Sequence, residues 1–175
     1  PPIETIVKDG LGIEIFDVFE NFEQEPFASA SVAQVHNATL KNGDQVVVKV
    51  LRPGIEKTIR QDLKLLKSVA RLIHKTSAVG RRLRLIDVVN DYEKIIFNEL
   101  DLRSEAANTT QLARNFNSSP ELYIPKIYWD FTSHNIMVME KIHGVPVSDI
   151  EKLKESGVDL KRLAETGVNI FFTQV

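Results

Sequence analysis

The sequence predicts an α+β fold in which a small antiparallel sheet is combined with long helices. Three observations support this prediction. Asn42-Gly43 supplies the positive φ angles of a tight hairpin turn. The run 45–50 that follows is rich in β-branched valine, which favours a strand. Along 55–73, apolar residues recur at intervals of three and four, which is the spacing of an amphipathic helix.

Composition limits the classes of protein to consider. The 175 residues are 43% hydrophobic and 26% charged, which is ordinary for a globular domain with a core. Nucleic-acid binding through the cluster of Arg81, Arg82 and Arg84 has little support, because acidic residues outnumber basic ones by 24 to 22 and no aromatic stacking platform is evident. There is no cysteine, and no apolar run reaches the roughly 18–20 residues that span a membrane. Because the chain starts at Pro1 and stops within an apolar pattern, we expect a fragment of a longer protein.

The remaining elements are predicted in chain order. Residues 1–10 resemble the end of a helix closed by glycine, and 13–22 is helix or loop, because its period is mixed. A first hairpin covers 23–40 and a second returns through Lys49. The later segments are a helix to about residue 74, a loop at 77–84, one long helix over 86–115, strands at 124–131 and 135–139, a flexible crossing at Gly144 and Pro146, a short helix capped by Ser148-Asp149, and a final helix over about 160–175.

Lys49 is a single charge among the valines of the predicted strand. A buried ammonium group requires an anionic partner. The alternative is an edge-strand lysine whose amine reaches solvent. The order of the segments favours a partner: the small-residue loop Ala28-Ser29-Ala30-Ser31 comes first, then a turn, then the lysine strand. This is the layout of a protein-kinase N-lobe, in which a loop covers the ATP phosphates and a strand lysine reaches them.

Three motifs carry a family resemblance. They are Phe-Ala-Ser-Ala-Ser-Val-Ala-Gln-Val-His at 27–36, Val-Val-Lys-Val-Leu-Arg-Pro-Gly at 47–54, and Asn-Glu-Leu-Asp at 98–101. Through them nearly the whole chain resembles the UbiB/ADCK family of atypical protein-kinase-like ATPases. The ending, from Val-Ser-Asp at 147–149 to Phe-Phe-Thr-Gln-Val at 171–175, resembles the bacterial UbiB branch more closely than the mitochondrial one. The resemblance implies a kinase-like fold that binds ATP with Mg, hydrolyses ATP and supports ubiquinone biosynthesis. It also implies a kinase-like N-lobe with inserted helices over 1–141, followed by the hinge exit and a truncated helical C-lobe over 142–175.

The resemblance assigns roles to residues of this chain. The cofactor-binding residues are expected to be Ala28, Ser29, Ala30 and Ser31 of the loop, Lys49, and Met139, Glu140 and Ile142 at the hinge. Alanine allows fewer positive φ angles than the glycine of ordinary kinases, so the loop should be stiffer. The catalytic residues are expected to be Lys49, Glu99 and Glu105. Six residues turn about 600° around a helix, so the two glutamates point to different sides. We expect one of them to pair with Lys49 and the other to lie on a family-specific extension. We expect His36 to be structural rather than catalytic.

Other motifs of the family are absent from the chain. They are the His-x-Asp-x-His-Pro-Gly-Asn loop, the Asp-Phe-Gly metal ligand and the Lys-x-Gly-Gln motif. Phosphoryl transfer requires a base and metal ligands. We therefore expect no metal site in this chain, Mg ligands outside it, and an inactive fragment of a protein that is an enzyme as a whole. The alternative is a non-catalytic regulatory module that uses a kinase-like fold to bind lipid or partner proteins.

The resemblance also implies partners, namely adenine nucleotide, ubiquinone-biosynthesis proteins and lipid precursors, and a location at the cytoplasmic side of the bacterial inner membrane. The helix over 55–74 has a basic face, which is either solvated or in contact with anionic lipid. That face consists of Lys57, Arg60, Lys64, Lys67 and Arg71. At the end of the chain, Phe171, Phe172 and Val175 form an apolar surface, from which we expect weak self-association of the fragment. Because the metal ligands and most of the second lobe are absent, we also expect the fragment to bind nucleotide poorly.

Overall fold

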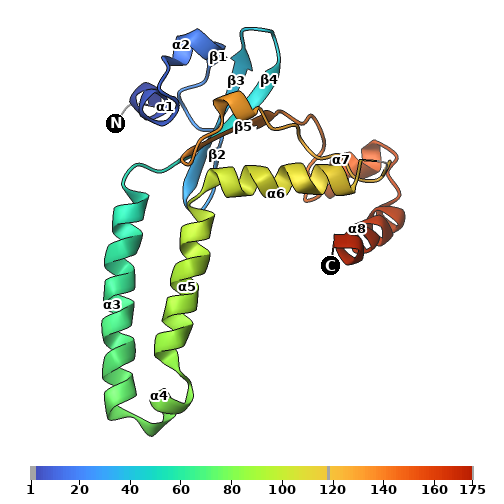
Figure 1. Ribbon diagram of the computed structural model, residues 1–175. Coiled ribbons are helices and arrows are strands. Elements are labelled where there is room, and N and C mark those ends of the chain that lie inside the picture. Colours follow the sequence, from blue (N-terminus) through green and yellow to red (C-terminus); the bar gives the residue numbers. More distant parts are fainter. Residues whose placement is uncertain (1–2, 118, 175) are drawn as a thin grey trace.

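The computed structural model describes residues 3–117 and 119–174, without the side chains of 81 and 174, and it confirms the α+β fold (Figure 1). A five-stranded antiparallel sheet has the order β1-β3-β4-β5, and β2 pairs with β3 beside this path. The strands are β1 (Phe19–Phe22), β2 (Ala28–Ser29), β3 (Ala33–Leu40), β4 (Gln45–Leu51) and β5 (Ile136–Glu140). The helices are α1 (Ile3–Leu11), α2 (Ile15–Val18), α3 (Ile55–Thr76), α4 (Ala78–Arg82), α5 (Leu85–Glu99), α6 (Leu102–Asn115), the 3-10 helix η1 (Trp129–Phe131), α7 (Ile150–Glu155) and α8 (Leu160–Gln174).

The hairpin of β3 and β4 forms the centre of the sheet. Gly43 has a φ of +88°, and the Leu40 amide donates to the Asp44 carbonyl (2.9 Å), so the predicted Asn-Gly turn is confirmed. Successive side chains of a strand point to opposite faces. On one face of β4, Val46, Val48 and Val50 are almost fully buried. Lys49 therefore points to the other face, between Val47 and Leu51.

Each face of the sheet has its own core. On the valine face, α1 and α2 pack with Phe19 and Phe22 of β1. His36 is also buried there: its ring lies 5.3 Å from that of Phe22, and its Nδ1–H donates to the Glu23 carbonyl (2.9 Å). The expected structural role of His36 is thus confirmed. On the Lys49 face, Leu102 and Ala106 of α6 pack against Leu51 of β4 and Met137 of β5.

Between β4 and α6 the chain forms a helical hairpin that projects from the sheet, with α4 at its far end (Figure 1). The antiparallel helices α3 and α5 are joined by an ion pair between Lys67 Nζ and Glu93 Oε2 (2.6 Å). Nearer the sheet, the Arg60 guanidinium lies 4.4 Å from the centre of the Phe97 ring. The hairpin therefore has internal contacts of its own along its length.

The predicted secondary structure was wrong for two segments near the sheet. Residues 13–22, expected to be helix or loop, contain α2 and then the strand β1, because Phe19 and Phe22 face the core and pair with β3. Residues 124–131, expected to be a strand, make a single bridge at Ile127 to Met139 and then enter η1. Pro125 has no amide to donate, which limits strand pairing there.

The prediction of one long helix over 86–115 was also wrong, because this segment forms two helices. Helix α5 ends at Glu99 and α6 begins at Leu102. The break occurs at Leu100, which is buried, and at Asp101, whose side chain accepts from the Arg103 amide as the N-cap of α6 (3.0 Å). The expected loop at 77–84 likewise contains the short helix α4.

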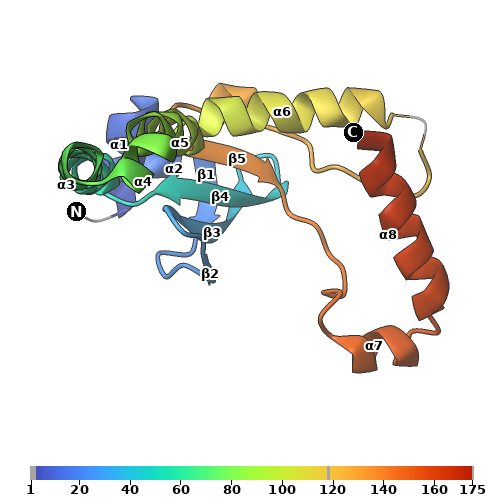
Figure 2. The same cartoon turned by 90° about the horizontal axis from the view of Figure 1, so that it is seen from below.

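After β5, the chain runs through an extended linker to α7 and α8, which lie apart from the sheet (Figure 2). The predicted cap of α7 is confirmed, since the Asp149 carboxylate accepts from the Lys152 amide (3.2 Å). The domain boundary between residues 141 and 142 stays a prediction.

Tyr128 connects the segment before η1 to the central hairpin and generates a testable prediction. Its hydroxyl donates to Asp44 Oδ2 (2.9 Å), and burial, with a smaller effect of Asp44, raises the pKa of Tyr128 to about 12. Because this folded-state pKa is raised, the contact stabilises the fold below about pH 10 and is lost as pH rises through about 12. In an absorbance titration of the three tyrosines, Tyr128→Phe should remove the component that ionises near pH 12.

The control is Tyr92→Phe, which should leave that component in place, with circular dichroism reporting the folded state. If Tyr128→Phe instead removed a component that ionises near the ordinary tyrosine pKa of about 10, the hydroxyl would be solvated.

At acid pH, the Tyr128 hydroxyl and then the Asn42 amide hold the pKa of Asp44 below its usual range. The stabilisation from Asp44 is therefore present above about pH 4 and is lost as pH falls through the lowered value.

Candidate functional site

The candidate site is built on an ion pair between the sheet and α6. Lys49 Nζ donates to both carboxylate oxygens of Glu105, at 2.8 and 2.7 Å. The Lys49 side chain is 18% exposed and that of Glu105 is 41% exposed. Charge-assisted hydrogen bonds of this kind are short and directional. The ammonium group is therefore held in one orientation at the edge of the core.

Helix α6 is fixed at its first turn, close to Glu105. The Asp101 carboxylate caps the helix, and the Leu102 amide donates to the His134 carbonyl (2.9 Å) in the turn before β5. Asp101 also lies 3.3 Å from His134 Nδ1. Leu102 and Ala106, on either side of Glu105 in sequence, are fully buried. Asp101, the last residue of the Asn-Glu-Leu-Asp motif, thus positions α6.

A cavity of about 870 Å³ opens beside the ion pair. Its lining comes from β4, the end of α5 and α6, and consists of Lys49, Asn98, Glu99, Ser104, Glu105, Asn108, Thr109 and Leu112. The structure selects Glu105 as the partner of Lys49. Glu99 nevertheless faces the same cavity, because the break at residues 100–101 changes the direction of the chain. The expectation that the two glutamates would point to different sides was therefore wrong.

The predicted loop from Ala28 to Ser31 contains β2 and the start of the tight turn that connects β2 to β3. Ala28 and Ser29 pair with Val35 and Gln34, and the Ala30 amide donates to the Ala33 carbonyl (2.9 Å). Arg52, a residue to which sequence reasoning gave no role, donates through Nη2 to the Ala30 carbonyl (3.3 Å), while its amide donates to the Val32 carbonyl (2.9 Å). The loop is therefore attached to the end of the lysine strand.

The predicted hinge residues differ in how their backbone groups are engaged. Met139 pairs with Val47 inside the sheet. The Glu140 amide donates to the Lys126 carbonyl (2.9 Å), and its carboxylate accepts from the Tyr123 hydroxyl (2.7 and 2.8 Å), which raises the pKa of Tyr123. Ile142 lies beyond the strand and is 49% exposed. The Glu140 amide is therefore not available to a ligand.

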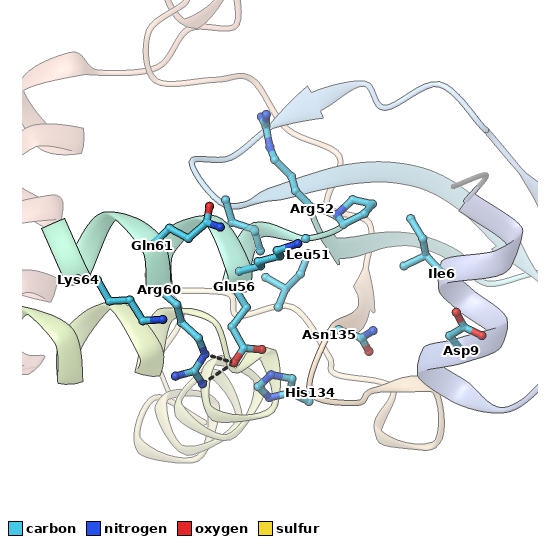
Figure 3. A pocket seen from close by; sticks show the side chains of 14 residues that line it. Ile6, Asp9, Leu51, Arg52, Glu56, Arg60, Gln61, Lys64, His134 and Asn135 are labelled. Atoms are coloured by element: carbon cyan, nitrogen blue, oxygen red, sulfur yellow. Dashed lines mark hydrogen bonds and ion pairs between the residues drawn. The ribbon is translucent and has the colours of Figure 1, made fainter.

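Other parts of the described structure can be compared with the Lys49 cavity as candidate sites. Within residues 3–117 and 119–174, no group of three or more His, Asp or Glu side chains is placed to hold a metal ion. A separate cavity of about 730 Å³ lies between α1 and the start of α3 (Figure 3). There the Arg60 guanidinium is held by Glu56 and by the Phe97 ring. We place the candidate site at Lys49, where the oriented ammonium borders open space.

An antiparallel sheet whose strand lysine is held by a glutamate of a packed helix is the N-lobe arrangement of protein kinases. The comparison with known families agrees. Residues 2–175 match the family described as the ABC1 atypical kinase-like domain, and the chain belongs to that family.

Individual relatives support the same assignment. The chain is 56% identical over 171 residues to a protein from Azotobacter vinelandii named "Probable protein kinase UbiB", covering 98% of this chain and 32% of the relative. It is 53% identical over 172 residues to a protein of the same name from Cellvibrio japonicus, covering 98% of this chain and 31% of the relative. The structure of Rv3197 from Mycobacterium tuberculosis in complex with erythromycin is 28% identical, with a TM-score of 0.71 over 85% of this chain and 37% of that one.

The exposure of the ion pair predicts that it adds little to stability. Glu105→Gln should lower the free energy of unfolding by no more than about 1 kcal/mol, since the Glu105 side chain is 41% exposed and partly exposed ion pairs contribute little. Leu102→Ala, at the fully buried start of α6, should lower it by about 2–5 kcal/mol. Urea unfolding curves compare the two variants, with Glu99→Gln as the matched control. An effect of Glu105→Gln as large as that of Leu102→Ala would contradict this view of the pair.

Proposed function

We propose that this chain is the ATP-binding N-lobe of an atypical kinase-like ATPase. The observation that carries the proposal is the ammonium of Lys49, fixed by Glu105 beside an open cavity. In kinases, a lysine held in this way contacts the phosphates of ATP. Nothing about folding alone requires a lysine in this valine strand.

Each part of the site has a role in this proposal. Lys49 binds and orients the phosphates, and Glu105 orients Lys49. The loop of Ala28, Ser29, Ala30 and Ser31 lies over the phosphates, where backbone amides and serine hydroxyls donate to oxygen. Since the Glu140 amide is engaged with Lys126, the adenine edge would meet the Glu140 carbonyl and the backbone from Ile142 onward. Glu99, which faces the same cavity, is a second acidic group near the phosphates.

Mg, when bound, would neutralise the charge of the phosphates. The residues that the structure describes do not form a set of ligands for it.

The chain spans about a third of the length of the curated relatives it matches. For the whole protein we propose a role in ubiquinone biosynthesis, in line with the UbiB name of those relatives. Its partners would then be ubiquinone-biosynthesis proteins and lipid precursors at the cytoplasmic side of the bacterial inner membrane. Among the described helices, none combines the length and apolar character needed to cross a membrane.

A second candidate function is a non-catalytic scaffold. The observation that favours it is the exposed apolar surface of α8, where Phe171 is 61% and Phe172 is 72% exposed. Such a surface suits a protein partner or weak self-association of the isolated chain. Val175, the third residue of the predicted surface, lies outside the described residues.

Replacing Lys49 separates the two candidates. In the whole protein, Lys49→Met should weaken Mg-ATP binding by about 10–100-fold, the value of a lost charged hydrogen bond. Its thermal unfolding should change little, because the pair is partly exposed. Isothermal calorimetry measures the affinity, and Lys41→Met, in an exposed turn, is the matched control. Unchanged affinity in the Lys49 variant would favour the scaffold.

The loop gives a further prediction. Ala30→Gly should tighten Mg-ATP binding, because glycine widens the φ range and lets the backbone approach a phosphate more closely. The same calorimetric titration applies, with Ala78→Gly at the far end of the hairpin as the control. If both variants bind as the parent protein does, the loop does not face the phosphates.

A further inference from the structure

The far half of the helical hairpin has an extreme charge distribution. All 24 acidic residues of the chain lie outside the segment 63–86, which we call the tip segment. The tip segment contains His74 and the basic residues Lys64, Lys67, Arg71, Lys75, Arg81, Arg82 and Arg84. A chain with a net charge of −2 therefore concentrates positive charge in one place.

The fold carries this charge away from the sheet. Helix α3 leads outward, α4 turns the chain, and α5 returns. The turn at α4, within the tip segment, is therefore the part of the hairpin farthest from the sheet (Figure 1). Two residues of the basic face of α3 are engaged: Arg60 contacts Glu56 and the Phe97 ring, and Lys67, in the first part of the tip segment, pairs with Glu93. At the end of the hairpin, Lys75 and Arg82 are exposed, and Arg84 pairs with Asp87 while remaining 78% exposed.

Large apolar side chains gather at the same end. Leu72 of α3, Val79 of α4, Leu83 of the following turn and Val88 of α5 are 57–64% exposed. They do not result from loose packing, because α4 fits closely on α3. A Cβ atom at Gly80 would lie 2.5 Å from Ile73 Cγ2 and 2.8 Å from the Ile73 carbonyl oxygen. The tip is thus a closely packed turn that presents apolar side chains outward among cations.

We propose that the end of this hairpin docks on an anionic lipid surface. Cations near such a surface each strengthen binding by about fivefold, and exposed leucine and valine side chains enter the boundary between headgroups and acyl chains. The tip segment has no Phe, Trp or Tyr on which a nucleic-acid base could stack. Neither the cation cluster nor the apolar side chains take part in the Lys49 site, so this docking surface is independent of nucleotide binding.

A site-specific label tests the contact directly. Because the chain has no cysteine, Leu83→Cys allows an environment-sensitive fluorophore to be attached at the tip alone. With phosphatidylcholine vesicles that contain phosphatidylglycerol, its emission should shift to the blue and increase. Vesicles of phosphatidylcholine alone should produce no shift, and a label at Lys154→Cys on α7 should report no change with either vesicle. Equal shifts at both labels, or with both vesicles, would overturn the proposal.

Charge reversal supplies the second arm. Lys75→Glu with Arg82→Glu should reduce co-sedimentation with the anionic vesicles by at least about tenfold. The matched control, Lys154→Glu with Lys161→Glu, makes the same change in net charge on α7 and α8 and should bind as the parent chain does. Circular dichroism verifies that all variants are folded. Binding that both pairs weaken alike would indicate a general effect of net charge, and a preference for RNA without a shift at position 83 would indicate a polyanion site; either result would overturn lipid docking.

Discussion

The cation on the otherwise apolar strand β4 is met by an anion, and that anion comes from a helix far along the sequence. The contact between Lys49 and Glu105 requires α6 to lie on one face of the sheet, at a fixed distance from it. Three features hold α6 in that position: the Asp101 cap, the hydrogen bond from Leu102 to the turn before β5, and the burial of Leu102 and Ala106. The opposite face is then free to be covered by α1 and α2, which form the other core.

The helical hairpin between β4 and α6 is compatible with this constraint for two physical reasons. The entropic cost of closing a loop rises only slowly with the length of the loop, so a long insertion costs little if it has stabilising contacts of its own. Helices α3 and α5 have such contacts, between Lys67 and Glu93 and between Arg60 and Phe97. The break at Leu100 and Asp101 then lets α6 take a direction different from that of α5, so that Glu105 meets the sheet while the hairpin points away.

The elements that sequence could predict are those set by local rules. The turn at Asn42-Gly43, the valine strand around Lys49 and the periodic helix from Ile55 have this character. The break at 100–101 was missed because the apolar periodicity runs on through it; Asp101, a favoured N-cap residue directly before a buried leucine, was the available signal. The strand β1 is stabilised by long-range pairing with β3, which short-range pattern does not reveal. For the same reason, periodicity could identify two candidate glutamates but not which one reaches Lys49.

The energetics of the ion pair explain why it points to function rather than to folding. With Glu105 41% exposed, the pair contributes about 0–1 kcal/mol, and replacing ion pairs by apolar residues is often neutral or stabilising. A valine at position 49 would match its neighbours, extend the apolar surface beside Met137, and remove the need for a carboxylate on α6. A chain selected for stability alone would therefore gain little from this lysine. Lysine instead supplies an ammonium group that a carboxylate holds at 2.7–2.8 Å, on the border of a cavity of about 870 Å³. Recognition of a phosphate requires an oriented cation of this kind, which valine would not supply.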